Sequence, residues 1–180
     1  AYIHTYPGGE RLALIRPRQR DLATIAQQYL DRTVPGARET IAALQTRGIK
    51  TAIVSGGLLD AVLPLAAAVG VAAADTFAVS LQFDDAGNYL RYLDNPLTTA
   101  GGKAEVVAVW KKQHGLKHVV MVGDGMSDVA ARAPNAADRI IGYGGVVERA
   151  AVRTAADQYS TARDLRELLP LILGDATAGR

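Results

Sequence analysis

The sequence predicts an α/β fold in which a mostly parallel sheet has helices on both faces. Short apolar runs typical of buried strands alternate along the chain with amphipathic stretches typical of helices. Glycine and other turn-forming residues separate most of these runs. With 180 residues, 49% of them hydrophobic, the chain is long enough for one packed domain and at most a small appendage.

The order of expected elements follows from the spacing of apolar residues. Helices are expected over residues 21–30, 37–46, 58–69, 101–113, 146–152 and 161–172, with a short one between residues 128 and 139. Strands are expected over residues 50–54, 119–122 and 139–141. Residues 77–83 and 89–93 flank the sequence Asp-Asp-Ala-Gly-Asn, which favours a β-hairpin turn. We expect this hairpin to be a local excursion and not a second domain.

Composition excludes several classes of function. The absence of cysteine rules out disulfides, thiolate zinc sites and a cysteine nucleophile, and it agrees with a reducing, cytoplasmic location. A net charge of +2, one Trp and no long basic run argue against nucleic-acid binding. The longest apolar run, residues 61–74, contains Pro64 and Gly70 and is shorter than the roughly 20 residues of a membrane span. The first residues lack the pattern of a signal peptide.

Polar side chains stand where a ligand site of such a fold is expected. Ser55 follows one apolar strand, Asp124 and Asp128 follow another, and Lys103 begins a helix. Because the carboxyl ends of parallel strands gather at one crevice, we expect these four side chains to lie there together. A hydroxyl, an ammonium group and helix N–H groups suit phosphate, and two carboxylates suit a hard cation such as Mg²⁺. Together they predict metal-assisted phosphoryl chemistry.

Each of these signals has an ordinary structural explanation when it is taken alone. A Ser-Gly-Gly sequence after a strand is usually a turn, and a lysine at a helix start is usually solvated. Asp124 can act as a helix N-cap, although two aspartates four residues apart beside a buried strand need a cation or a donor. His114 and His118 are separated by Gly115 and lack a third ligand, so we interpret them as surface histidines.

The ordered set of motifs resembles the haloacid dehalogenase (HAD) superfamily of phosphohydrolases. Ser55 matches its second motif, Lys103 its third, and residues 123–128 its fourth. The resemblance narrows to the phosphoserine phosphatase family over the segments 10–15, 34–36, 54–57, 101–103 and 141–145, which occur in that family's order. It implies a HAD-like, Rossmann-like core over residues 33–173. Residues 1–32 would be the remnant of a small helical cap, and residues 174–180 a frayed tail.

The resemblance also implies an activity and a role for each matched residue. The activity is Mg²⁺-dependent hydrolysis of O-phosphoserine through an aspartyl-phosphate, the last step of serine biosynthesis. Ser55 and the N–H groups of Gly56 and Gly57 would hold the phosphoryl group, and Lys103 would neutralise it together with the attacking carboxylate. Asp124 would bind Mg²⁺, and Asp128 would orient the metal shell and the lysine.

Three further residues match positions that contact the substrate in this family. Ser127 lies inside the fourth motif, and Arg149 follows Gly142 by seven residues. Arg11 matches a cap arginine that pairs with the serine carboxylate, whereas the ordinary interpretation of a lone arginine is a surface position. The expected partner is therefore a small phosphorylated substrate, with neither nucleic acid nor membrane, and the chain is a candidate homodimer.

One departure from the superfamily is serious. Its first motif, Asp-x-Asp, supplies the nucleophile and the general acid/base, and no Asp-x-Asp occurs in these 180 residues. Its strand would lie between the strands that end at Ser55 and at Asp124. Three explanations are open: truncation of a longer protein, which we favour, a strand supplied by another copy or fragment, or a degenerate relative. The alternative functions are action on another small phosphomonoester and a catalytically silent phosphate-binding module.

Overall fold

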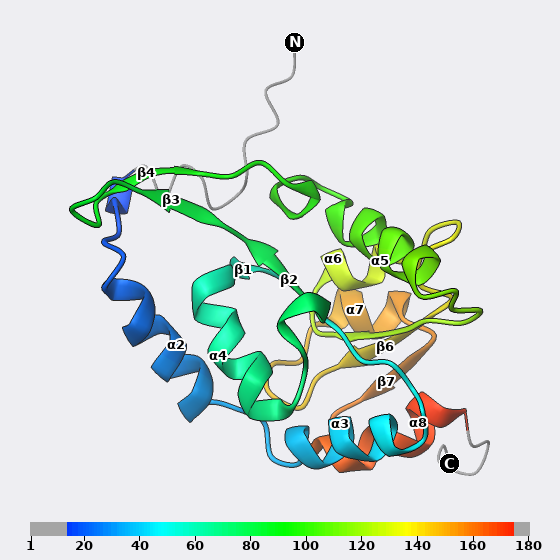
Figure 1. Ribbon diagram of the computed structural model, residues 1–180. Coiled ribbons are helices and arrows are strands. Elements are labelled where there is room, and N and C mark those ends of the chain that lie inside the picture. The colour runs from blue at the N-terminus through cyan, green and yellow to red at the C-terminus, as the bar shows by residue number, and fades with distance from the viewer. Residues whose placement is uncertain (1–13, 175–180) are drawn as a thin grey trace. The chain divides into compact units, whose positions relative to one another are not determined.

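The computed structural model describes residues 14–174, and the chain falls into two compact units (Figure 1). The first unit contains residues up to 33 together with 41–102, and the second contains residues 34–40 together with those from 103 onward. Helix α3 (Ala37–Thr46) belongs partly to each unit. No helix among the described residues is long and apolar enough to cross a membrane.

The first unit is built on a parallel pair of strands. Strand β1 (Ile53–Leu58) pairs with β2 (Thr76–Val79), and helix α4 (Leu59–Val69) connects them. Helix α2 (Asp21–Asp31) packs along α4, which lies between α2 and the strands (Figure 1). Parallel pairing with a helical crossover is the βαβ arrangement that the alternation of apolar runs predicts.

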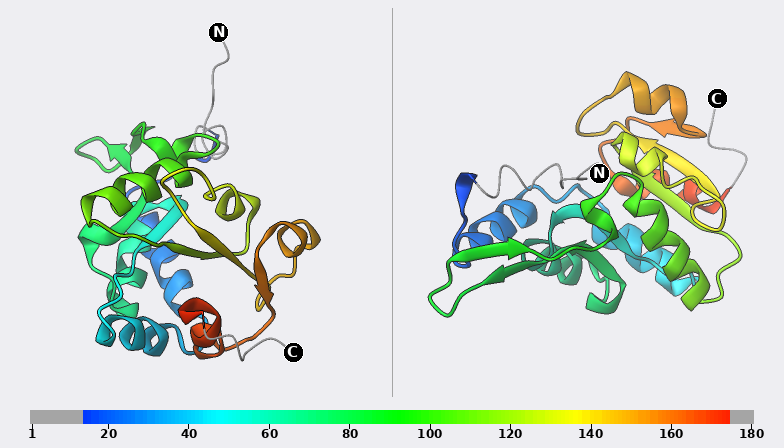
Figure 2. Two further views of the ribbon diagram at one scale, coloured as in Figure 1. Left: turned by 90° about the vertical axis from the view of Figure 1, so that its right-hand side faces the viewer. Right: turned by 90° about the horizontal axis from the view of Figure 1, so that it is seen from above.

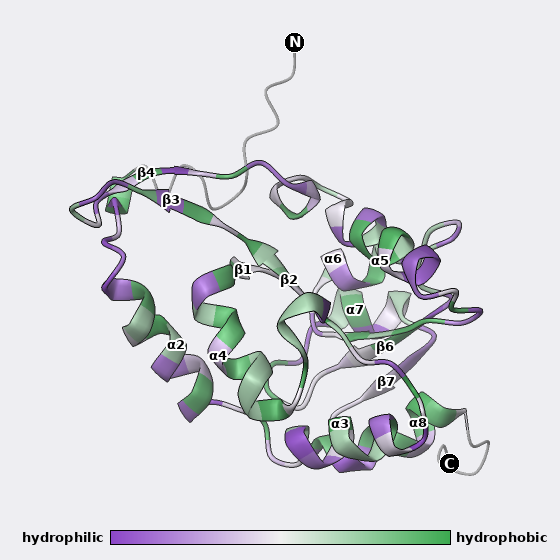
Figure 3. Ribbon diagram, viewed as in Figure 1, coloured by the Kyte–Doolittle hydropathy of each residue, from purple (hydrophilic) through white to green (hydrophobic). Residues whose placement is uncertain are grey.

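Helix α4 supplies much of the core of this unit. Most of its length is hydrophobic (Figure 3). Its buried side chains are Ala61, Val62, Ala66 and Val69. Their spacing of one, three or four residues keeps them on the faces that contact β1, β2 and α2. The expected helix over 58–69 is therefore confirmed to within one residue.

The expected hairpin is present, but its first arm is divided between two sheets. Residues 76–79 form β2, whereas β3 (Leu81–Phe83) pairs in antiparallel fashion with β4 (Tyr89–Tyr92). The turn is held by Asp84, whose Oδ1 accepts hydrogen bonds from the N–H groups of Ala86 and Asn88. Hydrogen bonds from the Asn88 side chain and backbone hold the pKa of Asp84 below its ordinary value. Gly87 adopts a φ of 75°, which this turn requires and glycine tolerates.

The second unit contains a three-stranded parallel sheet. Its strands are β5 (Val120–Gly123), β6 (Arg139–Tyr143) and β7 (Gln158–Ser160), in the order β5-β6-β7. Its helices are α5 (Gly102–Gln113), α6 (Met126–Val129), α7 (Ala150–Ala155) and α8 (Leu169–Leu173). Helices α6 and α7 are neighbours (Figure 2). The most deeply buried large side chains of this unit are Ile140, Ile141, Val152 and Leu168.

Three short 3₁₀ helices complete the described elements. They cover Ala73–Asp75, Pro96–Thr98 and Leu165–Leu168. The last one covers only the middle of the long helix expected over 161–172, and residues 161–164 are not helical, so the expectation of one continuous α-helix is wrong. Asp164 accepts a hydrogen bond from the N–H of Arg166 and tightens this turn, and α8 begins only at Leu169. Residues 158–160 pair with β6 as a strand that the apolar pattern of the sequence does not predict.

Two other expected boundaries also need correction. The helix expected over 146–152 begins at Ala150, because Arg149 has an extended backbone. The strand expected over 50–54 starts at Ile53 and continues to Leu58. Its register with β2 is regular at Val54 and becomes irregular before Leu58. The Ser-Gly-Gly sequence therefore lies inside the irregular half of β1, and not in a turn after it.

Candidate active site

A buried ion pair stands at the centre of the candidate site in the second unit. Lys103 lies in the first turn of α5, and its Nζ is 2.5 Å from Oδ1 of Asp128 in α6. The two side chains are only 16% and 7% exposed. The N–H of Gly125 donates to the other carboxylate oxygen, Oδ2, at 2.9 Å. Both oxygens of Asp128 are thus engaged, as a buried carboxylate requires.

Gly123 makes room for the Asp128 side chain at the end of β5. A Cβ on Gly123, the last residue of β5, would lie 2.5 Å from the Asp128 Cβ and would overlap its carboxylate. Only glycine therefore permits Asp128 to pack against the end of the strand. This fit fixes the direction in which the Lys103 ammonium approaches.

A second, more exposed ion pair lies at the end of the same strand. Arg149 donates from Nη2 to Oδ2 of Asp124 at 3.2 Å and from Nε to the same oxygen at 3.4 Å. Both side chains are about half exposed. The motifs predict both residues at the site but do not predict this contact. Two opposite charges 25 positions apart give no periodic signal in the sequence, so only the fold shows it.

Ser55 forms a local hydrogen bond in the irregular half of β1, in the first unit. Its Oγ accepts a hydrogen bond from the N–H of Gly57 at 3.0 Å, and the side chain is partly buried. A Cβ on Gly57 would lie 3.1 Å from that Oγ and 3.2 Å from the hydroxyl oxygen of Tyr29. The Ser55 hydroxyl is therefore an acceptor within its own strand, and Gly57 has close neighbours on its side-chain face.

The expected site residues are thus distributed over both units. Lys103, Asp124, Ser127, Asp128 and Arg149 all belong to the second unit, where Ser127 is exposed on α6. Ser55, Gly56 and Gly57 belong to the first unit, so the shared crevice stays a prediction. Arg11 lies outside the described residues.

Of the two aspartates at the end of β5 and in α6, Asp124 is the one that fits a divalent cation. They contain no cluster of three or more His, Cys, Asp or Glu side chains that could hold a metal ion. Asp128 is occupied by Lys103 and Gly125, whereas Asp124 is exposed and uses only Oδ2 for its ion pair. Mg²⁺ typically takes one or two carboxylates and retains several waters, so Asp124 fits as one ligand of such an ion.

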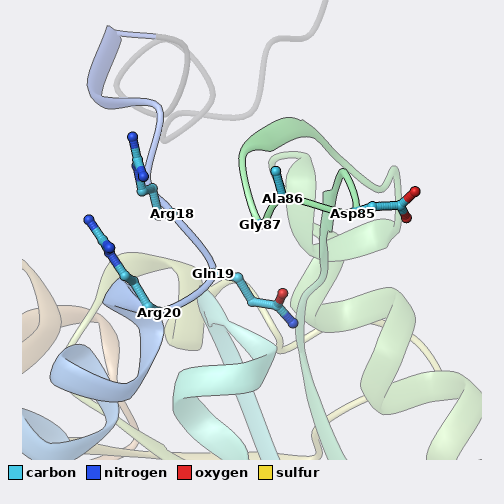
Figure 4. Close-up of a pocket in the computed structure, with 6 residues that line it drawn as sticks. All are labelled: Arg18, Gln19, Arg20, Asp85, Ala86 and Gly87. Atoms are coloured by element: carbon cyan, nitrogen blue, oxygen red, sulfur yellow. The ribbon is translucent and has the colours of Figure 1, made fainter.

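A separate pocket in the first unit contains none of the expected site residues. It has a volume of about 440 Å³ and is lined by Arg18, Gln19, Arg20, Asp85, Ala86 and Gly87. Arg18 and Arg20 extend side by side, and Gln19 points in another direction (Figure 4). The N–H of Gln19 donates to the carbonyl of Gly87 and joins this segment to the hairpin turn. Exposed arginines on a surface segment do not by themselves define a site.

Comparisons with known proteins agree with this architecture. Residues 6–134 match the haloacid dehalogenase-like hydrolase family. The phosphoserine phosphatase of Bos taurus is 35% identical over 161 residues, which are 89% of this chain and 70% of the bovine protein. A substrate-bound phosphoserine phosphatase structure aligns with a TM-score of 0.66 at 29% identity, over 77% of this chain and 63% of that one.

A larger protein is also similar in structure. DsGPDH of Dunaliella salina aligns with a TM-score of 0.73 at 31% identity, and it covers 88% of this chain. The chain spans only 27% of the length of that protein. The fold is therefore found both in phosphoserine phosphatases and as one part of a longer polypeptide.

The chain belongs to the haloacid dehalogenase-like hydrolases, and within them to the phosphoserine phosphatase family. This result confirms the α/β fold class and the family resemblance that the sequence motifs indicate.

Proposed function

We propose that this chain carries the phosphate- and metal-binding machinery of a Mg²⁺-dependent phosphoserine phosphatase. The reaction is hydrolysis of O-phosphoserine to serine and phosphate. The observation that carries the proposal is the largely buried ion pair between Lys103 and Asp128. Asp124 lies close in sequence, directly after the last residue of strand β5. This arrangement supplies a fixed positive charge and an accessible carboxylate, which phosphoryl transfer needs for charge neutralisation.

Lys103 is the proposed electrostatic partner of the phosphoryl group. An ammonium group has three donors, and the bond to Asp128 Oδ1 accounts for one of them. Asp128 holds the ammonium at a fixed position. The free-energy cost of reorienting the lysine is therefore small when charge develops on the phosphate oxygens. In the first unit, Ser55 Oγ and the N–H groups of Gly56 and Gly57 are the proposed ligands of the same group. The Gly57 N–H would then exchange its bond to Ser55 Oγ for one to the phosphate.

Asp124 is the proposed Mg²⁺ ligand, and Ser127 and Arg149 are the proposed substrate contacts. When bound, Mg²⁺ would supply further positive charge against the phosphate oxygens. The Arg149 guanidinium, which pairs with Asp124, can instead donate to an anionic group of the substrate because its side chain is half exposed. These assignments rest on motif position and on the accessibility of each side chain.

The attacking carboxylate is proposed to come from outside these 180 residues. The Asp-x-Asp sequence is absent, and the carboxylates of Asp124 and Asp128 have other proposed roles. By analogy with the family, a new bond would form between an aspartate oxygen and phosphorus while the bond to the serine oxygen breaks. Water would then release phosphate. Among the described residues, β1 and β5 each have a ladder partner on one side only, which supports pairing with a further strand.

Binding of phosphoserine tests this proposal without requiring turnover. By isothermal titration with Mg²⁺ present, we expect saturable binding that Lys103→Met weakens about tenfold to a hundredfold, because a charge-assisted hydrogen bond is lost. Lys112→Met, which removes an exposed lysine from the same helix, is the matched control and should leave the affinity unchanged. Absence of binding, or equal losses in both variants, would contradict the proposal.

Substrate choice is tested with a ligand that lacks the carboxylate. If Arg11 pairs with the serine carboxylate, Arg11→Ala should weaken phosphoserine binding about tenfold and phosphoethanolamine binding by less than about twofold. Isothermal titration of both ligands into both proteins measures the difference. Equal losses would assign Arg11 a structural role and would favour another small phosphomonoester as the substrate.

Four finer points stay predictions from the sequence. They are a role in serine biosynthesis, a cytoplasmic location, a homodimer, and a complementing N-terminal segment.

A further inference from the structure

Two glycines of the segment 142–145, Gly142 and Gly144, lie against one aromatic ring. A Cβ on Gly142 would lie 2.6 Å from Cδ2 of Tyr159, and a Cβ on Gly144 would lie 2.7 Å from its Cζ. Neither glycine has a positive φ, so these positions need glycine for space and not for backbone conformation. Tyr159 stands in β7 directly opposite Gly142 of β6, which explains why its ring lies over this segment.

The same tyrosine reaches the residue that pairs with Asp124. The backbone N–H of Arg149 donates to Oη of Tyr159 at 3.4 Å. The guanidinium of Arg153, one turn later in α7, lies 4.8 Å from the centre of the Tyr159 ring. The ring therefore contacts the end of β6, the residue before α7, and α7 itself.

The connection between Gly145 and Arg149 lies at the surface, where Glu148 forms an exposed ion pair with Arg153 of α7. Val146 and Val147 are 72% and 48% exposed, so the core does not hold this loop by burial. The ion pair of Arg149 with Asp124 is half exposed, and exposed pairs contribute little free energy by themselves. A fixed backbone at Arg149 removes part of the entropy that the pair must otherwise overcome.

We propose that Tyr159 is a positioning residue that sets the place of Arg149 against Asp124. Its ring holds the segment 142–144, and its hydroxyl fixes the backbone from which the Arg149 side chain departs. The effect of Tyr159 on ligand binding is transmitted through the Arg149 guanidinium. That last step rests on the proposed function, because it takes Arg149 as a substrate contact.

Two variants separate the hydroxyl from the ring. Tyr159→Phe keeps the ring and removes the acceptor, and Tyr159→Leu removes both. In the free protein, the NMR signal of the Arg149 side-chain Nε–H should move toward that of free arginine in Tyr159→Phe and further in Tyr159→Leu. Tyr89→Phe, a tyrosine of the β-hairpin, is the control and should leave this signal unchanged.

Phosphoserine affinity with Mg²⁺ gives the second readout. We expect Tyr159→Phe to lower this affinity about threefold to tenfold, which is the effect of one hydrogen bond. When Tyr159→Phe or Tyr159→Leu is combined with Arg149→Ala, we expect no further loss of affinity beyond that of Arg149→Ala alone. A loss of equal size in the Arg149→Ala background would make the role of Tyr159 merely structural and would overturn the inference.

The two readouts keep failures of the two proposals apart. An unmoved Arg149 Nε–H signal in folded Tyr159→Phe and Tyr159→Leu proteins would overturn the positioning role whatever the ligand does. A moved signal in a chain that does not bind phosphoserine would support the positioning role and contradict the proposed function. If Tyr159→Leu does not fold, Tyr159→Phe alone decides the result.

Discussion

The close fit between Gly123 and Asp128 governs the site at the scale of single residues. The carboxylate lies against the end of β5, where a Cβ would displace it, and it accepts from both Lys103 and Gly125. Removal of either charged partner leaves the other buried and unpaired, which costs more free energy than the pair contributes in place. The position of the Lys103 ammonium therefore depends on Gly123, a residue that has no side chain of its own.

Substitution of Gly123 tests this dependence. Gly123→Ala should lower the free energy of unfolding by about 1–3 kcal/mol, because the new methyl group forces Asp128 out of its position. Urea denaturation followed by circular dichroism measures this change. Gly125→Ala is the matched control, because the nearest atom to its new Cβ would be Asp128 Oδ2 at 3.4 Å. This variant should lower the free energy of unfolding much less than Gly123→Ala does. Equal losses of unfolding free energy in the two variants would show that the close fit at Gly123 does not hold Asp128 in place.

Motif spacing predicts Lys103 and Asp128 as residues of one site, because each stands at the end of an element whose place in an α/β sheet is regular. The contact between Asp124 and Arg149 is not predictable in this way. It depends on how far the loop after β6 extends before α7 begins, a long-range property of the fold in which Tyr159 contacts both ends of that loop.

At the scale of elements, strongly periodic segments are predictable and loop-rich segments are not. Helices α2, α3, α4 and α5 begin and end within one residue of the expected positions. The region after β6 differs, because long-range contacts override local propensity there. The N–H of Leu165 donates to the carbonyl of Pro35, and Asp164 packs against Gly36. A helix over 161–172 would sacrifice these contacts.

The Asp164–Arg166 pair of this region makes stability depend on pH. Hydrogen bonds from the Arg166 side chain and backbone lower the pKa of Asp164 to about 2. A carboxyl group whose pKa is lower in the folded state stabilises the fold above its ordinary pKa of 3.8, and this stabilisation is lost as pH falls through about 2. Asp164→Asn should therefore lower Tm at pH 5–7, and the difference from the unsubstituted chain should shrink between about pH 4 and 2.

Thermal melts at several pH values check this expectation. Asp85→Asn, which removes an exposed aspartate of the hairpin turn, is the control for a change of net charge alone. A Tm difference for Asp164→Asn that stays constant down to pH 2 would show that ionisation of Asp164 does not carry the effect.

At the scale of the whole molecule, the proposed binding residues lie in this chain, whereas we propose that the attacking carboxylate does not. The 180 residues contain the second, third and fourth motifs of the family and no Asp-x-Asp. The sequence predicts the parallel α/β architecture, whereas the two separate ladders, β1-β2 and β5-β6-β7, are visible only in the structure. Strand pairing depends on residues that are far apart in the sequence. The alternation of apolar runs therefore predicts that strands are present, but it does not predict which strand edges stay unpaired.

Phosphate release from phosphoserine shows whether this chain contains its own attacking group. Residues 1–180, expressed without any upstream segment and assayed with Mg²⁺, should bind phosphoserine but release phosphate no faster than the background. The reason is that Asp124 pairs with Arg149 and Asp128 pairs with Lys103, and in the proposed function neither serves as the carboxylate in line with the leaving serine oxygen. Release that saturates with phosphoserine and disappears in Lys103→Met would contradict this account and would require a nucleophile within this chain.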